Sequence, residues 1–444
     1  MRNYDLELPI SLENVAIQKD LEKCISCGHC TKVCDEEITK QQKIDMEEER
    51  EPLCISCGQC TLICPVESLH EKMHMQKVKS IIENKEGKVL VFSVDSSVGV
   101  SIAEEFGLEE GTNLTSKIPT ALRALGADYV FSLSFGSDLH ILETSMELVN
   151  RILSNGPTLY TSSCPSWTEY AQVFFPEIRS SLSTCKTPMS IQSSIIKTYY
   201  ATKMKKLPAE IIHIVITSCT AKKREAKDSE IKVTEQDTDY VLTTREFARL
   251  LKEKNIDLSK IEDTNYDEPT KNSSAMSLSM HRTGGLAESI IKCSYYLLTN
   301  QKEGINHLSL DELKGTQAIK ETSIQIKNKT IKVAVINGIK NVKEFMEKHN
   351  QDDAYDLVEV MTCQGGCISG GGQPKATLLK MQETKQKRRE ILDQEERETL
   401  VSTSYDNKEI KRIYQQFLQE PGSKIARQLL HTTYQDKSYL LGGK

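Results

Sequence analysis

The sequence feature that most constrains the fold is a cysteine motif that occurs twice near the start of the chain. Residues 24–34 read CISCGHCTKVC and residues 54–64 read CISCGQCTLIC, so the spacing C-x2-C-x2-C-x3-C is repeated. In chains with this spacing, three closely spaced thiolates hold one cubane iron–sulfur cluster and the fourth cysteine reaches the other cluster. The two expected ligand sets are Cys24, Cys27, Cys30 with Cys64, and Cys54, Cys57, Cys60 with Cys34.

This segment resembles a bacterial two-cluster ferredoxin. The resemblance implies two [4Fe-4S] clusters that transfer electrons. The alternative is a pair of zinc knuckles, but a structural zinc site is closed by four ligands and does not need eight cysteines that cross over. We therefore expect an electron-transfer domain at the start of the chain.

Length and composition exclude several other classes of protein. The chain has 444 residues, of which 38% are hydrophobic and 27% charged, and its net charge is -6. These values are typical of globular domains and give no reason to expect nucleic acid as a partner. The start, MRNYDLELPI, lacks the basic and apolar regions of a secretory signal, and the apolar runs are too short to cross a membrane. Since fourteen cysteines in a long chain of this kind indicate metal or redox chemistry, we expect a cytoplasmic redox protein without a membrane partner.

After the cysteine motif, apolar strands alternate with helical segments. Strands are predicted at residues 88–94, 127–135, 158–162, 211–217, 239–243, 331–336 and 355–361. This alternation predicts α/β lobes with largely parallel sheets. The predicted organisation is an α+β ferredoxin-like domain at residues 1–80, a two-lobed α/β domain at 81–380 and a helical C-terminal segment at 381–444, which begins with the charged stretch 383–398.

Three further cysteines occupy the same position relative to a predicted strand. Cys164, Cys219 and Cys363 each follow the expected carboxyl end of a strand, where open α/β sheets build their ligand sites. Cys367 adds a fourth thiol, and four thiolates from three loops can hold a cubane cluster between two lobes. The two cysteines left over, Cys185 and Cys293, are expected to be buried as small hydrophobic residues.

Two of these loops carry further signals. The loop after Cys363 has five glycines in the eight residues 365–372, which allows the backbone to approach something bulky. After Cys219, Lys222 places a cation three residues from the thiolate and Glu225 a carboxylate three residues further on. A basic side chain here can bind an anionic ligand of a cofactor.

The three loops TSSCPSW, TSCTAKKREA and EVMTCQGGCISGGGQP resemble the signature loops of [FeFe]-hydrogenases, and the similarity extends over nearly the whole chain. The resemblance implies an H-cluster: a [4Fe-4S] cube held by Cys164, Cys219, Cys363 and Cys367, with Cys367 bridging to a diiron unit that carries CO, cyanide and an azadithiolate. It implies reversible heterolytic cleavage or formation of H2. It also implies a ferredoxin-like electron carrier and hydrogenase maturation proteins as partners.

The same resemblance assigns roles around the diiron unit. Lys222 is expected to donate to one cyanide, Ser97 to offer a hydrogen bond near the other, and Met361 to pack against the irons. Gly365 and Gly366 belong to the cofactor-binding loop. Cyanides in a dry pocket require donors, and an open iron site requires apolar walls.

The chain departs from the family along the proton route. Ser163 stands where the family has the cysteine that donates a proton, and an alkanol is far too weak an acid to replace a thiol of pKa about 8.5. Thr144 stands where the inner glutamate is expected, whereas the outer residues of the route, Glu147, Arg151 and Ser183, are present. Glu147 and Arg151 are also spaced i, i+4, which suits a helix salt bridge.

The loss of the thiol leads to the hypothesis that Glu225 or His281 begins a different proton route. It also leaves two other functions open. One is an H2-sensing regulatory hydrogenase with low turnover, and the other is a hydrogenase-like iron–sulfur assembly protein, which also lacks the first-loop thiol. The two complete ferredoxin motifs and the loop GGCISGGGQP favour the hydrogenase.

Overall fold

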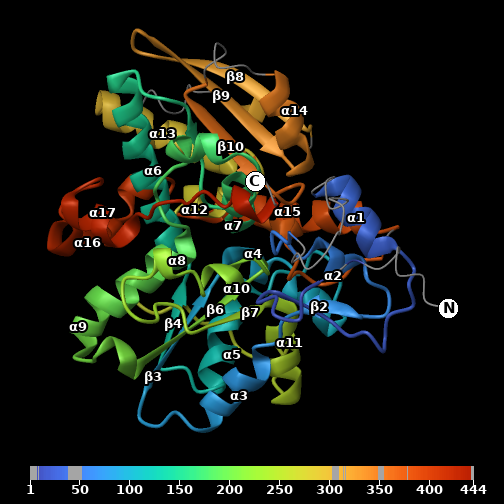
Figure 1. The fold of residues 1–444 in the computed structure, drawn as a ribbon. Coiled ribbons are helices and arrows are strands. Elements are labelled where there is room, and N and C mark those ends of the chain that lie inside the picture. Colours follow the sequence, from blue (N-terminus) through green and yellow to red (C-terminus); the bar gives the residue numbers. More distant parts are fainter. Residues whose placement is uncertain are drawn as a thin grey trace.

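The computed structural model describes residues 8, 10–38, 53–302, 310–313, 315, 317–348, 355–377 and 379–441. The chain forms a small N-terminal domain and two α/β lobes (Figure 1). The elements of the N-terminal domain are β1 (Ile17–Lys19), α1 (His29–Glu37), α2 (Gln59–Ile63) and β2 (Leu69–Glu71). The two strands pair antiparallel.

The lobe at the bottom of Figure 1 is built on a four-stranded parallel sheet. The strand order is β4 (Tyr129–Ser132), β3 (Val89–Val94), β6 (Ile211–Thr217) and β7 (Tyr240–Thr243). Its helices are α3 (Met75–Glu83), α4 (Ser96–Gly99), α5 (Ile118–Ala124), α10 (Lys222–Glu225) and α11 (Thr244–Glu253). The central strands, VLVFSV and IIHIVIT, are buried along nearly their whole length, as expected for a parallel sheet with helices on both faces.

The second lobe also has a four-stranded sheet, in the order β5 (Leu159–Tyr160), β10 (Leu357–Met361), β9 (Lys329–Asn337) and β8 (Ile319–Ile326). Its helices are α6 (Ser134–Ser154), α7 (Pro165–Phe174), α13 (Gly285–Thr299) and α14 (Lys340–Lys348). Strand β8 is antiparallel to β9 and was not predicted. Its sequence, IKETSIQI, alternates apolar and polar residues and has exposed positions, so it lacks the continuous apolar run of the other strands.

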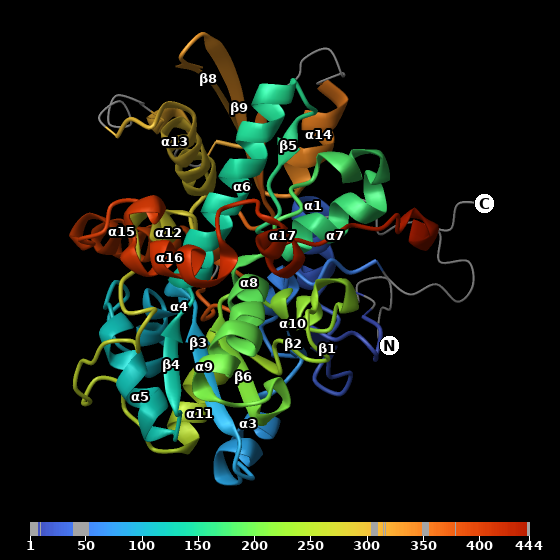
Figure 2. The same cartoon turned by 90° about the vertical axis from the view of Figure 1, so that its left-hand side faces the viewer.

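The remaining helices lie between and beside the lobes. They are α8 (Pro188–Ile195), α9 (Ala201–Met204), α12 (Ala275–Ser279), α15 (Met381–Glu398), α16 (Lys408–Ile413) and α17 (Lys424–Leu430). Figure 2 shows α12, α15 and α16 in the layer between the two lobes. The predicted helical character of the C-terminal segment is confirmed, and the charged stretch forms α15, which buries Ile391 and Leu392.

All seven predicted strands are present, although most are shorter than expected. The strand predicted at residues 127–135 ends at Ser132, because the backbone turns into helix α6 at Ser134. Within the described residues, no helix combines the length and apolar content that crossing a membrane requires.

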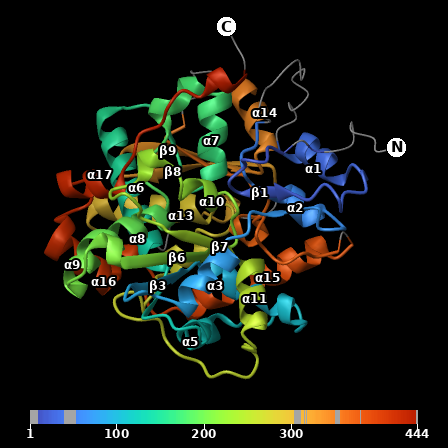
Figure 3. The same cartoon turned by 60° about the horizontal axis from the view of Figure 1, so that its bottom comes forward.

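The fold brings the carboxyl ends of strands from both sheets to one junction. Strands β3 and β6 of the first lobe and β5 and β10 of the second all end there, since the residues that follow them lie together. The N-terminal domain lies beside the region between the lobes (Figure 1). The C-terminal helices α16 and α17 lie on the opposite side of the molecule from α1 and α2 (Figure 3).

Candidate metal centre

The two cysteine motifs of the N-terminal domain adopt the same backbone conformation. Ser26 and Ser56 both have positive φ, and the glycines that follow, Gly28 and Gly58, cap α1 and α2 with φ of 74° and 71°. Glycine adopts this left-handed conformation without steric cost. Each repeat therefore wraps its first three cysteines around the start of a short helix in the same way.

The thiols of the second repeat lie together with the last cysteine of the first. Burial raises the pKa of the Cys57 thiol well above its ordinary value, and the neighbouring thiols of Cys34, Cys60 and Cys54 raise it further. The pKa of Cys60 is raised for the same reasons, through burial and then through Cys54, Cys34 and Cys30. These contacts agree with the expected crossing of Cys34 to the second set.

The four cysteines predicted at strand ends also come together. Cys164 caps α7 after β5, Cys219 follows β6, and Cys363 and Cys367 follow β10. Burial raises the pKa of Cys367 well above its ordinary value, and Asp95 and the thiols of the other three cysteines raise it further. The four thiols thus meet at the junction of the lobes.

The two groups of cysteines are neighbours in space. Cys57 of the N-terminal domain is close enough to raise the pKa of Cys363, after burial and Cys164. Gln59 joins the groups directly, because its amide nitrogen lies 3.3 Å from Cys363 Sγ and 2.9 Å from the Ser369 carbonyl. This contact joins residues 304 positions apart and was not predicted from the sequence.

The glycine-rich loop packs against protein backbone. A Cβ at Gly371 would lie 2.3 Å from the Cys57 carbonyl oxygen, and one at Gly370 would lie 2.4 Å from that of Ser218. A Cβ at Gly366, whose φ is +100°, would lie 2.4 Å from the His281 carbonyl oxygen. The glycines were predicted to let the backbone approach a bulky group. In the structure, Gly371 lets the loop contact the N-terminal domain, Gly370 lets it contact the loop of Ser218, and Gly366 lets it contact the loop of His281.

The residues present fit iron–sulfur clusters. Cys57 and Cys60 are buried and Cys363 and Cys367 are partly buried, and the negative forms of neighbouring thiols would repel one another, so such a set is stable as thiolates only around a positively charged partner. Among the described residues, no three His, Cys, Asp or Glu side chains are close enough to hold a single metal ion.

Lys222 and Glu225 form a buried polar group beside Cys219. Lys222 Nζ lies 3.4 Å from Glu225 Oε2 and 3.2 Å from Thr187 Oγ1. Burial by itself would lower the pKa of Lys222, but Glu225 and Cys219 raise it above its ordinary value. Glu225 also accepts hydrogen bonds from the hydroxyls of Thr187 and Ser190, so its carboxylate is held in place.

Asp95 is a site residue that the sequence interpretation missed. It follows β3, accepts a hydrogen bond from Ser97 N, and lies 3.1 Å from His281 Nε2. Burial opposes the charge on both side chains, but their pairing lowers the pKa of Asp95 and raises that of His281. Ser97 Oγ donates to Asp95 and can accept from Ser218 Oγ, which lies 2.8 Å away. The sequence signal that could have identified Asp95 is its position directly after a buried strand. Met361, at the end of β10, is 3% exposed.

Two of the outer residues predicted for the proton route, Glu147 and Arg151, line a cavity of about 490 Å3. Glu147 accepts from Ser183 Oγ and from Thr184 N and Oγ1, and His431 Nδ1 lies 2.7 Å from Thr184 Oγ1. Arg151 donates to main-chain carbonyls, among them Thr158 at 2.6 Å, so the alternative of a helix salt bridge with Glu147 is wrong.

The inner part of this route is different. Thr144 is fully buried, and its hydroxyl lies beside the thiol of Cys185. Ser163 is half-buried beside Cys164. The leftover cysteines, Cys185 and Cys293, are fully buried in the core of the second lobe, as predicted.

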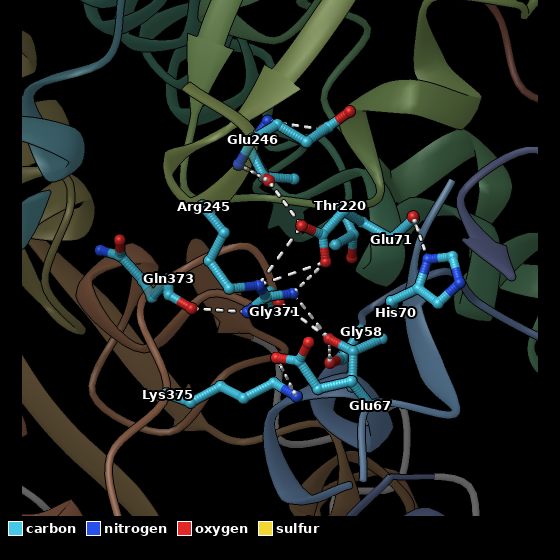
Figure 4. A network of polar contacts seen from close by, with 12 residues as sticks. Gly58, Glu67, His70, Glu71, Thr220, Arg245, Glu246, Gly371, Gln373 and Lys375 are labelled. Carbon is cyan, nitrogen blue, oxygen red and sulfur yellow. Dashed lines mark hydrogen bonds and ion pairs between the residues drawn. The ribbon is translucent and has the colours of Figure 1, made fainter. Parts of the chain in front are cut away.

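A buried network joins the N-terminal domain to the first lobe (Figure 4). Arg245 of α11 pairs with Glu71 at the end of β2 and donates to Thr61 Oγ1 and to the Gln373 carbonyl. Burial would raise the pKa of Glu71, but Arg245 and Arg249 lower it to about 2. Lys375 and Glu67 add an ion pair of 3.3 Å at the edge of the joint (Figure 4).

Three families match successive parts of the chain. Residues 15–69 match a 4Fe-4S dicluster domain, residues 88–371 the C-terminal domain of the iron-only hydrogenase large subunit, and residues 382–437 the iron hydrogenase small subunit.

The chain is similar to two kinds of known protein. It is 35% identical to iron hydrogenase 1 of Clostridium pasteurianum, over 94% of this chain and 75% of that protein. It is 27% identical to the cytosolic Fe-S cluster assembly factor narfl of Danio rerio, over 82% of this chain and 91% of that protein. A solved structure of the apo [FeFe]-hydrogenase HydA1 from Chlamydomonas reinhardtii superposes with a TM-score of 0.72 at 30% identity, covering 82% of this chain and 99% of that one.

Proposed function

This chain belongs to the iron-only hydrogenase family, and from that premise we propose that it catalyses the reversible heterolytic cleavage or formation of H2 at an H-cluster. The observation that carries the proposal is the meeting of Cys164, Cys219, Cys363 and Cys367 at the junction of the lobes, with Lys222 beside them. When bound, the H-cluster would supply an iron site that polarises H2 and exchanges electrons.

The proposed cofactors are an H-cluster on these four cysteines and two [4Fe-4S] clusters in the N-terminal domain. Electrons would enter from a ferredoxin-like carrier and pass through the N-terminal clusters. The closeness of Cys57 to Cys363 and the bridging amide of Gln59 support the last step of that path. Hydrogenase maturation proteins as partners and a place in the cytoplasm are part of the same proposal.

We propose that Lys222 orients and stabilises an anionic ligand of the cofactor. The residue is 6% exposed, and its ammonium is fixed by Glu225 and Thr187. A charged donor held in a dry site stabilises an anion far more than it would in water. Ser97 and Met361 would complete the surroundings, as a hydroxyl donor and an apolar wall, and Gly365 and Gly366 would shape the loop.

Ser163 makes the usual proton route slow, and we propose that Glu225 replaces its inner part. A cavity of about 180 Å3 is lined by Glu225, Thr187, Glu169 and Lys437. Since both Glu169 and Lys437 are partly exposed, this cavity offers protons a way from solvent to the Glu225 carboxylate. Glu147, Arg151 and Ser183 would then belong to a route that has lost its inner end at Thr144.

The second candidate function is a role in iron–sulfur cluster assembly. It is favoured by the similarity to assembly factors, which include the cytosolic iron-sulfur assembly component 3 of Bos taurus at 29% identity over 78% of this chain. The serine at position 163 fits both functions.

The deciding experiment is infrared spectroscopy of the protein produced together with hydrogenase maturation proteins. A hydrogenase should show bands from CO and cyanide and should evolve H2 from a reduced ferredoxin. The Cys367→Ala variant should lose both signals, whereas the matched control Cys293→Ala should keep them, because Cys293 is buried in the core away from the junction. Iron-loaded protein without CO and cyanide bands would instead support the assembly function.

A further inference from the structure

We propose that a cavity behind the third cysteine loop binds a small ligand that carries a phosphate or pyrophosphate group. The cavity has a volume of about 330 Å3 and lies between that loop and helix α15. Three cations, Arg282, Lys385 and Arg389, line it together with amide side chains, and none of its described lining residues is acidic. A site with this lining offers hydrogen-bond donors and positive charge to an anion.

Arg282 gives the cavity a guanidinium that is fixed in position and whose charge is balanced by carboxylates. The residue is 4% exposed, and its guanidinium pairs with Glu396, with Asp393 at 3.3 Å and with Glu288 at 3.9 Å. These carboxylates hold the side chain from outside the cavity, since none of them lines it. A guanidinium positioned in advance loses little conformational entropy when it binds an anion.

Helix α15 presents a second set of donors. Gln382, Lys385, Gln386 and Arg389 are spaced i, i+3, i+4 and i+7, so they share one face of the helix, and all four line the cavity. The face that α15 turns to this cavity therefore carries two cations and two amides.

Lys385 is a second cation of the cavity. It lines the cavity and forms no ion pair within the part of the chain that the structure describes; the negative groups that act on its ammonium are Cys363 and, more weakly, Glu37. A partly buried ammonium without a carboxylate partner is unfavourable unless an anion reaches it. The neighbouring Arg389 has only a long contact, 3.7 Å, to Asp393.

The volume of the cavity and its hydrogen-bond donors indicate which class of ligand it binds. The cavity volume is at the lower end of the range of about 300–1,000 Å3 for small-molecule sites. Arginine binds phosphate through two parallel hydrogen bonds, and several donors around one point suit the many oxygens of a phosphate or pyrophosphate group. Gln364 and Gly365 of the third loop also line the cavity, so a bound ligand would touch the segment between Cys363 and Cys367.

This inference goes beyond the proposed reaction with H2 and does not depend on it. Isothermal titration of the full-length chain with pyrophosphate should show saturable binding at one site that weakens as salt is added. The same titration with inorganic phosphate distinguishes a site for one phosphate group from a site for two. Lys385→Gln and Arg389→Gln should each weaken binding at least about tenfold, since each removes a charge-assisted hydrogen bond.

Two further variants make the test specific. Gln382→Glu places a carboxylate in the cavity at an exposed position and should weaken binding without disturbing the fold. Lys387→Gln is the control on the same helix, because Lys387 pairs with Glu383 and Glu110 and does not line the cavity; its affinity should equal that of the unaltered chain. The absence of saturable binding of either anion, or equal affinities in Lys385→Gln and Lys387→Gln, would overturn the proposal.

Discussion

Arg245 and Glu71 form an ion pair that is closed off from solvent where the N-terminal domain meets the first lobe. Arg245 Nη2 lies 2.5 Å from Glu71 Oε2, and the two side chains are 2% and 0% exposed. Arg249 approaches the other carboxylate oxygen at 3.3 Å (Figure 4 shows the network around Arg245). The pair fixes the N-terminal cysteines relative to the third loop, because Arg245 also binds Thr61 and Gln373.

Glu71→Gln should destabilise the joint between the domains. Removal of one charge leaves Arg245 buried without a carboxylate, and breaking a buried ion pair in this way costs about 3–5 kcal/mol. Urea unfolding and limited proteolysis should both report a weaker joint. The control is Lys79→Gln, which removes an exposed ion pair with Glu253 and should change little. Equal effects of the two variants would contradict the role given to Glu71.

The same pair predicts how stability changes at acid pH. The pKa of Glu71 is about 2 in the folded protein, below the value of about 4.3 in an unfolded chain, so the folded state favours the charged form. Its contribution, roughly 3 kcal/mol, is complete above the unfolded pKa and disappears as pH falls from about 4.5 towards about 2. The difference in unfolding free energy between the unaltered protein and Glu71→Gln should thus be constant from about pH 5 upwards and shrink below. A difference that grows on acidification would contradict this.

The sequence was sufficient for features that depend on local pattern. Buried parallel strands are continuous apolar runs, so β3 and β6 were predictable, and the cysteines that follow the strands could be expected at one edge of each sheet. Strand β8 was missed because its alternating residues are exposed on one side and it pairs antiparallel at the edge of its sheet.

Contacts between residues far apart in the chain could not be predicted from the sequence. The amide of Gln59 on Cys363, the ion pair of Asp95 with His281 and the packing of Gly371 on Cys57 each require the relative placement of loops. The alternative of a Glu147–Arg151 salt bridge is wrong for the same reason, because each side chain has partners outside its own helix.

Gly371→Ala should separate electron delivery from the chemistry of H2. Its Cβ would come within 2.3 Å of the Cys57 carbonyl and 2.6 Å of Gly58 Cα, so the N-terminal domain must move away from the third loop. H2 evolution from a reduced ferredoxin should fall by about tenfold or more, since small misplacements of reacting groups have large effects on rate. Exchange between H2 and D2O, which needs no external electrons, should change much less.

The matched control is Gly156→Ala, whose nearest neighbours lie 3.4 Å from the added atom. Both activities should be unchanged in it. An equal loss of evolution and exchange in Gly371→Ala would show that the substitution disturbs the cluster site itself, contrary to the role of this contact in electron delivery.

Ser163→Cys and Thr144→Glu should restore the usual proton route only when they are combined. The thiol supplies an acid of pKa about 8.5 next to the cluster site, and the glutamate supplies a carboxylate between it and the Ser183–Glu147 pair. Because each single variant keeps a hydroxyl in place of one of the two acids, neither substitution alone gives a continuous route. Exchange between H2 and D2O should rise by less than about tenfold in each single variant and by about a hundredfold in the double variant, which is within the range of general acid–base catalysis.

Glu225→Gln should slow exchange in the unaltered protein and have little effect in the double variant. If Ser163→Cys alone gives the full gain, or Glu225→Gln has no effect in the unaltered protein, the route through Glu225 is wrong.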